Sequence, residues 1–161
     1  MLRRFKIAQL LFLFFVLECT PHYQTTPHHI IPPPEEYNSR IKVRVITQDR
    51  SYPRGGPVDL KLEIENISQE VVSLDFDLNQ LFDFVIYRKG GEVWRWSYDK
   101  IFDKTQLNLY IYPGEVWTFQ TEWDTKDNQR RYVSGGRYYV EGILRISPVL
   151  KSEKVEIGLT D

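Results

Sequence analysis

The chain has very little cysteine and histidine, and all of it lies near the N-terminus. Its single cysteine is Cys19, and its three histidines, His22, His28 and His29, all precede residue 30. One cysteine cannot form a disulfide within the domain, so the fold must be stabilised by its hydrophobic core. The rest of the chain can form no Ser-His-Asp triad, no Cys-His pair and no zinc site with His or Cys ligands. We therefore expect a protein that is not an enzyme and uses no metal or cofactor.

The chain also lacks an excess of charge of either sign. It carries 21 basic and 22 acidic side chains, so it has no strong basic field and nucleic acid is not an expected partner. Aromatic residues are abundant, with 4 Trp, 10 Tyr and 9 Phe, which favours β structure and a filled core over disorder. A length of 161 residues suggests a single domain.

The N-terminus has the pattern of an export signal. Arg3, Arg4 and Lys6 precede an apolar run at residues 7–17. At about 1.5 Å per residue, this run is too short to span a hydrocarbon core about 30 Å thick. The pattern therefore predicts a signal peptide over residues 1–19 rather than a transmembrane helix.

Cys19 ends a segment that resembles a bacterial lipoprotein signal, in which the cysteine becomes the lipidated first residue. Glu18, however, occupies the position that a small residue usually takes. Two alternatives stay open, a lipid anchor on Cys19 or an ordinary signal with an incidental cysteine, so the protein is expected to be membrane-anchored, secreted or periplasmic. The proline-rich residues 20–37 predict an extended tether before a domain at residues 38–161.

From residue 41 onward the hydrophobic pattern has a period of two. Val58, Leu60, Leu62 and Ile64 alternate with charged residues, as in a strand with one buried face. Similar runs predict strands at 41–47, 58–65, 71–76, 82–88, 93–97, 107–112, 115–123, 137–146 and 154–159. In the eighth run, Gly142 leaves room for a bulge or a close neighbour. The pattern predicts an all-β fold, an immunoglobulin-like antiparallel β-sandwich of eight or nine strands, with a β-barrel as the alternative.

Residues 82–97 predict a β-hairpin with Trp94 and Trp96 on one face of its second strand. We expect the turn at residues 90–91, although a longer turn would change the pairing of the strands. Arg95 suits the solvent side, which would place both tryptophans in the core. The apolar side chains that alternate along the first strand would then need cover from a loop or a partner.

Several motifs occur in the order seen in one bacterial family. They are Phe82-Asp83-Phe84-Val85, Glu92-Val93-Trp94-Arg95-Trp96-Ser97, Phe102, Pro113-Gly114-Glu115, Trp123-Asp124 and Gly136-Arg137-Tyr138-Tyr139-Val140. Over roughly residues 58–146 the sequence resembles the BsuPI family, bacterial proteins named for an intracellular proteinase inhibitor. The resemblance implies an immunoglobulin-like sandwich that inhibits a subtilisin-type serine protease. Because this chain carries an export signal, we expect the inhibited protease to lie in the envelope or outside the cell.

Two segments are long enough to form an exposed inhibitory loop, residues 97–106 and residues 125–134. A substrate-like inhibitor needs a loop held in an extended shape, so that binding costs little ordering entropy. Lys126, Arg130 and Arg131 in the second segment suit a trypsin-like pocket better than a subtilisin one. The candidate contact residues of the first segment and the strand before it are Trp94, Arg95, Trp96, Tyr98, Asp99 and Phe102.

An immunoglobulin-like interaction or carbohydrate-binding module without inhibitory activity is the alternative function. Exposed tryptophans could stack on sugars, but the alternation places most of them with core residues; the four are Trp94, Trp96, Trp117 and Trp123. Asp75, Asp77 and Asn79 match the start of a calcium-binding loop. Gln80 and Ile86 stand where that loop needs Gly and Glu, so we expect no calcium site there.

Overall fold

The computed structural model describes residues 34–161. The predicted signal peptide, Cys19 and residues 20–33 of the predicted tether lie outside the described residues. Within the described part, no helix is long and apolar enough to cross a membrane.

A short helix opens the described chain. The helix α1 spans Pro34–Arg40, with acidic residues in its first turn and Arg40 in its last, an arrangement that complements the helix dipole. Tyr37 is buried, and its hydroxyl donates a hydrogen bond to the carbonyl of Ser73 at 3.3 Å. The predicted boundary between residues 37 and 38 therefore falls inside α1, and Tyr37, the last predicted tether residue, packs on the domain.

Strands make up most of the remaining described residues. They are β1 (Ile41–Thr47), β2 (Ser51–Pro53), β3 (Val58–Asn66), β4 (Val72–Phe76), β5 (Phe82–Arg88), β6 (Gly91–Arg95), β7 (Leu107–Ile111), β8 (Val116–Trp123), β9 (Gly136–Leu144), β10 (Leu150–Lys151) and β11 (Val155–Thr160). Every predicted strand is present, with ends that differ by at most two residues. The short strands β2 and β10 were not predicted.

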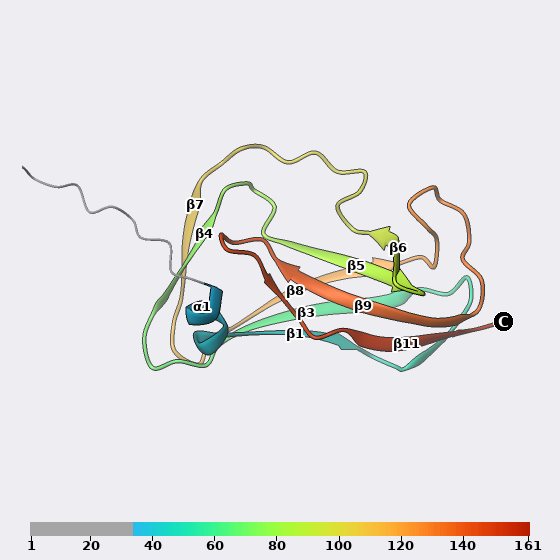
Figure 1. Cartoon of the computed structure of the whole chain (residues 1–161), viewed down its shortest axis with the longest axis horizontal. Helices are drawn as coiled ribbons and strands as arrows, with labels where there is room; N and C mark the ends of the chain where they lie inside the picture. The colour runs from blue at the N-terminus through green and yellow to red at the C-terminus, as the bar shows by residue number, and fades with distance from the viewer. Residues whose placement is uncertain (1–33) are drawn as a thin grey trace, which may run out of the picture. The chain divides into compact units, whose positions relative to one another are not determined.

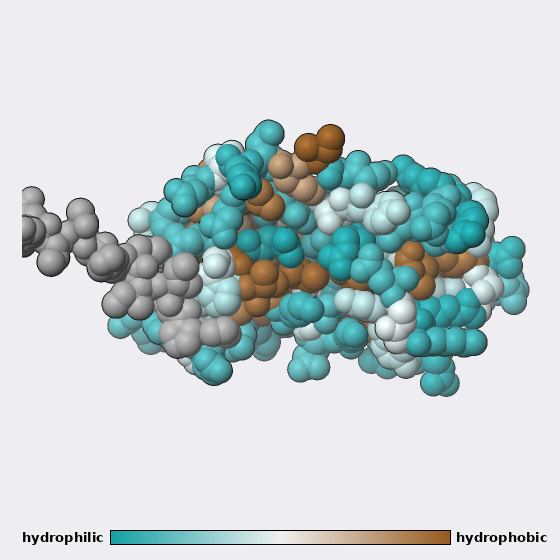
Figure 2. Space-filling model, turned by 45° about the horizontal axis from the view of Figure 1, so that its top comes forward, coloured by the Kyte–Doolittle hydropathy of each residue, from teal (hydrophilic) through white to brown (hydrophobic). Residues whose placement is uncertain are grey.

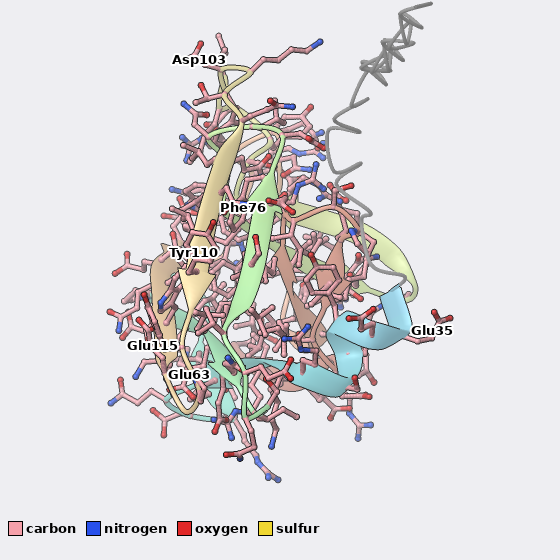
Figure 3. All side chains as sticks on the ribbon, turned by 90° about the vertical axis from the view of Figure 1, so that its left-hand side faces the viewer. Glu35, Glu63, Phe76, Asp103, Tyr110 and Glu115 are labelled. Carbon is pink, nitrogen blue, oxygen red and sulfur yellow. The ribbon has the colours of Figure 1, made fainter. Side chains whose placement is uncertain are left out.

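The strands form a β-sandwich. One sheet has the order β1-β3-β8, and the larger sheet has the order β2-β11-β9-β5-β6, with β10 paired to β9. These two sheets form the layers seen in Figure 1, and β4 and β7 pair as a separate ribbon, which Figure 3 shows with Phe76 and Tyr110 on its two strands. The pairings are antiparallel except for the parallel pair β2–β11. The prediction of an antiparallel sandwich is thus confirmed.

Two large aromatic residues lie at the centre of the core. Trp123 and Tyr138 are fully buried, and their ring centroids are 5.6 Å apart. The Tyr138 hydroxyl donates to the carbonyl of Ser134, four residues upstream, at 2.6 Å. This is the arrangement of the tyrosine corner found in immunoglobulin-like sandwiches.

Gly142 is where β9 crosses closest to the opposite sheet. A Cβ atom at this position would lie 2.4 Å from Cδ1 of Leu62 on β3 and 2.7 Å from Cγ2 of Val45 on β1. The expected close neighbour is therefore present, and it consists of two core side chains. Only a residue without a side chain lets the two layers approach this closely.

The hairpin of β5 and β6 has a different register from the predicted one. Its turn is Lys89-Gly90 rather than residues 90–91, and both turn residues have positive φ angles, 50° and 82°. A bulge then shifts the pairing so that Trp94 lies opposite Ile86. A two-residue turn with two positive φ angles matches the twist of the flanking strands.

With the shifted register, the tryptophans and the apolar side chains of β5 that were expected to need separate cover lie on the same face of the hairpin. Trp94 and Trp96 are partly buried against the core on the same side as Phe82 and Phe84. Phe82 stacks on Trp96 with centroids 4.4 Å apart. Phe82 on the apolar face of β5 is therefore covered by Trp96, which directly follows β6, and by Phe119 of the opposite sheet.

We predict that Gly142→Ala lowers the free energy of unfolding by about 1 to 3 kcal/mol, because the new methyl group would overlap Leu62 and Val45. Gly158→Ala is the matched control, since its Cβ would meet its nearest atoms at 3.7 and 3.8 Å. Denaturant unfolding of the purified protein measures both. An equal effect in the two variants would contradict the packing explanation.

Candidate functional site

A buried carboxylate joins β5 to β6 and to the segment that follows. Asp83 is 1% exposed. Its Oδ2 accepts hydrogen bonds from Arg95 Nη1 at 3.1 Å and Ser97 Oγ at 2.6 Å, and its Oδ1 accepts from the backbone N–H groups of Phe84 and Ser97 at 2.9 and 3.1 Å. These bonds compensate the loss of water around the buried charge. The motif residues Asp83, Arg95 and Ser97 thus hold the hairpin and fix where the next segment starts.

Arg95 points away from the core, as predicted, and its guanidinium is engaged on both sides. Besides Asp83, it binds Glu92, with Nη2 2.6 Å from Oε2. The hydrogen bonds that Arg95 donates to Glu92, followed by the one that it donates to Asp83, raise the pKa of Arg95 above its ordinary value despite partial burial. Arg95 is therefore a structural cation of this surface, with its charge already paired inside the protein.

The segment 125–134 closes on itself as a small hairpin. The carboxylate of Asp127 accepts hydrogen bonds from the backbone N–H groups of Gln129 and Arg131 at 2.9 and 3.0 Å, and from Arg131 Nη2 at 2.7 Å. These bonds, the one to the Arg131 side chain first, hold the pKa of Asp127 below its ordinary value. At the base, the Val133 N–H donates to the carbonyl of Thr125 at 3.0 Å.

Asn128 fastens this small hairpin to β6. Its Oδ1 accepts the backbone N–H of Arg95 at 2.8 Å, and its own N–H donates to the carbonyl of Val93 at 3.1 Å. These are backbone groups on the outer edge of β6, the last strand of its sheet. The loop therefore covers the edge and leaves these two groups unavailable for pairing with another strand.

The segment 97–106 begins with a tight turn and then runs without regular secondary structure to β7. In Figure 1 it leaves β6 and passes along the top of the picture to β7, while segment 125–134 stands on the other side of β6. An ion pair joins the two segments, with Arg130 Nη2 3.3 Å from Asp99 Oδ2. We call residues 97–106 and 125–134 together the two-loop surface.

The two-loop surface, β6 and the end of β8 line a shallow hollow of about 250 Å³. This volume is below the roughly 300 to 1,000 Å³ typical of small-molecule sites. Six of the predicted contact residues line it: Trp94, Arg95, Trp96, Tyr98, Asp99 and Arg130. Its size and charged lining suit contact with another protein better than capture of a small ligand.

The other predicted contact residues are engaged within the domain. The Phe102 ring lies against Trp96, with centroids 6.0 Å apart. Lys126 binds the Asp124 carboxylate at 2.9 Å, and this hydrogen bond raises its pKa. Arg131 is tied to Asp127, as described above. Of the three predicted basic residues, only Arg130 lines the hollow, and its side chain is 72% exposed, the same fraction as that of Arg131.

The four tryptophans all pack against the core of the described part of the chain. Trp123 is fully buried, and Trp94, Trp96 and Trp117 are partly buried against the core. The Trp117 indole donates to Glu115 at 2.9 Å. Within residues 34–161, no group of three or more His, Cys, Asp or Glu residues is gathered to hold a metal ion.

Sequence reasoning missed the residues that fix the loops. Asp127 and Asn128 bind the backbone, and short Asp and Asn side chains do this in many turns, so the composition of the segment offered a weak signal. Asp83 stood inside a quoted motif, but its partners are 12 and 14 residues away along the chain. Predicting that Asp83 accepts hydrogen bonds from both Arg95 and Ser97 would have required the register of the hairpin.

The strands and loops described above define a small β-sandwich. The model of the BsuPI family, described as intracellular proteinase inhibitor, matches residues 45–149. The match covers more than half of the chain, and the protein belongs to this family. The family is one of proteinase inhibitors, not of enzymes.

Comparison with curated proteins finds no match. Among solved structures, the sporulation control protein Spo0M from Bacillus subtilis is 15% identical, with a TM-score of 0.46 over 76% of this chain and 50% of that one. The alkylpurine DNA glycosylase AlkC from Pseudomonas fluorescens, bound to DNA, is 15% identical, with a TM-score of 0.46 over 76% of this chain and 31% of that one. The CARDB domain of the PF1109 protein from Pyrococcus furiosus is 8% identical, with a TM-score of 0.41 over 74% and 87%.

The chain thus spans half of Spo0M and less than a third of the glycosylase. Likenesses at these identities and TM-scores concern the fold alone, and nothing about function is carried over from them.

We predict that Asp83→Asn lowers the free energy of unfolding by about 2 to 4 kcal/mol, because it leaves Arg95 without its buried counter-charge. Glu92→Gln removes the partly exposed partner of the same arginine and is expected to cost less than about 1 kcal/mol. Denaturant unfolding measures both. Equal losses in the two variants would show that burial of the carboxylate is unimportant.

Proposed function

We propose that this protein inhibits a serine protease by non-covalent contact through the two-loop surface. Membership of a proteinase inhibitor family supports the activity. The observation that carries the location is the contact between segments 97–106 and 125–134 beside β6, where Arg130 pairs with Asp99 and both residues line the same hollow. Segments that are separate in sequence thereby form one continuous surface.

The stiffness of this surface supports an inhibitory role. Asp127 organises the tip of the second loop, and Asn128 fixes that loop to the backbone of β6. A loop ordered before binding loses little conformational entropy in the complex, and it resists adapting to the active site of a protease as a substrate would. Tyr98 and Arg130 remain exposed there, and Tyr and Arg are residue types enriched at the energetic centres of interfaces.

Titration against a panel of subtilisin-, elastase- and trypsin-type proteases tests the activity. We expect tight, reversible inhibition of at least one class, with the inhibitor recovered uncleaved. Arg130→Ala should weaken the inhibition by about tenfold, because it removes an exposed cation of the surface. Arg137→Ala is the matched control, an exposed arginine paired with Glu156 at 3.7 Å, and should change it by less than about threefold.

The proposal fails if no protease of the panel is inhibited at micromolar concentration, or if the domain is rapidly cleaved. A protein pull-down from the native host, followed by mass spectrometry, then addresses the alternative of a non-inhibitory envelope module. Recovery of glycan or assembly partners in place of a protease would support that alternative.

The protease partner lies in the cell envelope or outside the cell, and lipidated Cys19 anchors the inhibitor to the membrane. The basic and apolar pattern of residues 1–17, followed by a cysteine, supports this location. The proline-rich tether would then hold the domain away from the lipid surface.

Labelling with a fatty acid in the native host tests the anchor. We expect the wild-type protein to carry label and to sediment with membranes, and the Cys19→Ser variant to lose both properties, because the serine offers no thiol for lipid attachment. Unlabelled wild-type protein in the soluble exported fraction would instead indicate an ordinary signal with an incidental cysteine.

A further inference from the structure

One large apolar side chain on the two-loop surface is almost fully in water. Ile101 is 96% exposed, whereas the other exposed large hydrophobic residues in the described part reach 61% at most. Figure 2 views the molecule with the upper side of Figure 1 turned forward, and that face is mostly hydrophilic with scattered hydrophobic groups. Single exposed hydrophobic residues are common, so the meaning of Ile101 depends on how its neighbours are held.

Both neighbours of Ile101 are anchored on the same tryptophan. The Lys100 ammonium lies 4.7 Å from the centroid of the Trp96 ring, and the Phe102 ring centroid lies 6.0 Å from it. Trp96 is in turn stacked on Phe82 at 4.4 Å, which fixes it to the core of the sandwich. With its neighbours held to the domain on either side, Ile101 is left as the projecting side chain.

A second anchor follows two residues later. The Asp103 N–H donates to Asn79 Oδ1 at 3.1 Å, and the Asn79 N–H donates to the Asp103 carbonyl at 3.1 Å. Figure 3 shows Asp103 at the end of the β4–β7 ribbon that lies away from Glu115. Residues 100–103 have no helical or strand hydrogen bonding of their own, and they are held from both sides by contacts with the rest of the domain.

The surroundings of Ile101 are polar. Lys100, Asp103 and Lys104 are exposed beside it. An apolar side chain surrounded by charged residues is the arrangement found at the centre of protein interfaces, where one anchor enters a pocket of the partner and a polar rim excludes water. The arrangement therefore fits a partner that offers one apolar pocket.

We infer that Ile101 is the side chain that enters the primary specificity pocket of the inhibited protease, and that this pocket is apolar. The inference rests on the proposed function and names the contact residue and the class of target. An uncharged, branched side chain cannot pair with the acidic group of a trypsin-like pocket, whereas a hydrophobic pocket accepts it. The three basic alternatives are already paired, Lys126 with Asp124, Arg131 with Asp127 and Arg130 with Asp99.

Inhibition constants of the purified exported protein test the inference. With a subtilisin- or elastase-type protease that the wild type inhibits, Ile101→Ala should raise the inhibition constant by about 30-fold or more, as expected for the loss of a central anchor. Ile67→Ala is the matched control, a half-exposed isoleucine in the turn after β3, and should change it by less than about threefold. Because Ile101 is almost fully exposed, its replacement should leave the melting temperature unchanged.

The outcomes separate this inference from the proposed function. If the wild type inhibits an apolar-pocket protease and Ile101→Ala inhibits it equally well, the inference is wrong and the proposed function stands. Inhibition of the trypsin-type protease alone would also overturn the inference. If the wild type inhibits no protease, both fall together.

A charged replacement gives an independent readout. Ile101→Lys should lose inhibition of the apolar-pocket protease and gain inhibition or cleavage by the trypsin-type protease, because its side chain now suits that pocket. Cleavage should then occur after residue 101, which mass spectrometry of the fragments would identify. Unchanged selectivity between the two proteases would contradict the assignment of Ile101.

Discussion

The buried carboxylate of Asp83 is the constraint on which the surface described above depends. It is surrounded by the guanidinium of Arg95 and by both the hydroxyl and the backbone N–H of Ser97. A buried charge is tolerated only when its hydrogen bonds are satisfied, so the chain can leave β6 in few ways. The hydrogen bonds of Asp83 therefore fix the direction in which segment 97–106 leaves β6. The backbone N–H of Arg95 lies on the free edge of β6, where it donates to Asn128.

A row of packed aromatic rings connects the core of the sandwich to the exposed segment 97–106. Phe119 on β8 stacks on Phe82 at 4.8 Å, Phe82 stacks on Trp96, and Trp96 supports Phe102 in the exposed segment. The stack connects both layers of the sandwich to the loop. Such contacts are individually worth about 1 kcal/mol, but because they are consecutive, movement of the loop requires the loss of packing within the domain.

Local patterns were sufficient to predict the longer strands, but not the short strands β2 and β10 or the contacts between strands. The alternation around Leu62 identifies a strand because residues two positions apart lie on the same face, so that apolar and polar side chains alternate along the sequence itself. The bulge places Trp94 opposite Ile86, and the helix α1 buries Tyr37 beside β4. Both features depend on contacts with residues distant in sequence, which a local pattern cannot show. For the same reason, loop length predicted both segments of the surface, but not the bonds of Asn128 that join one of them to β6.

Without a disulfide within the domain, the stability of the loops is the sum of many small terms. A hydrogen bond such as that of Asn79 with Asp103 contributes about 1 kcal/mol, far less than a disulfide cross-link. A protease cleaves a bound loop when the loop opens locally, and that local free energy can be much smaller than the global one. The lifetime of an inhibitor of this kind therefore depends on contacts beside the loop, of Trp96 with Lys100 and Phe102, more than on the depth of the sandwich core.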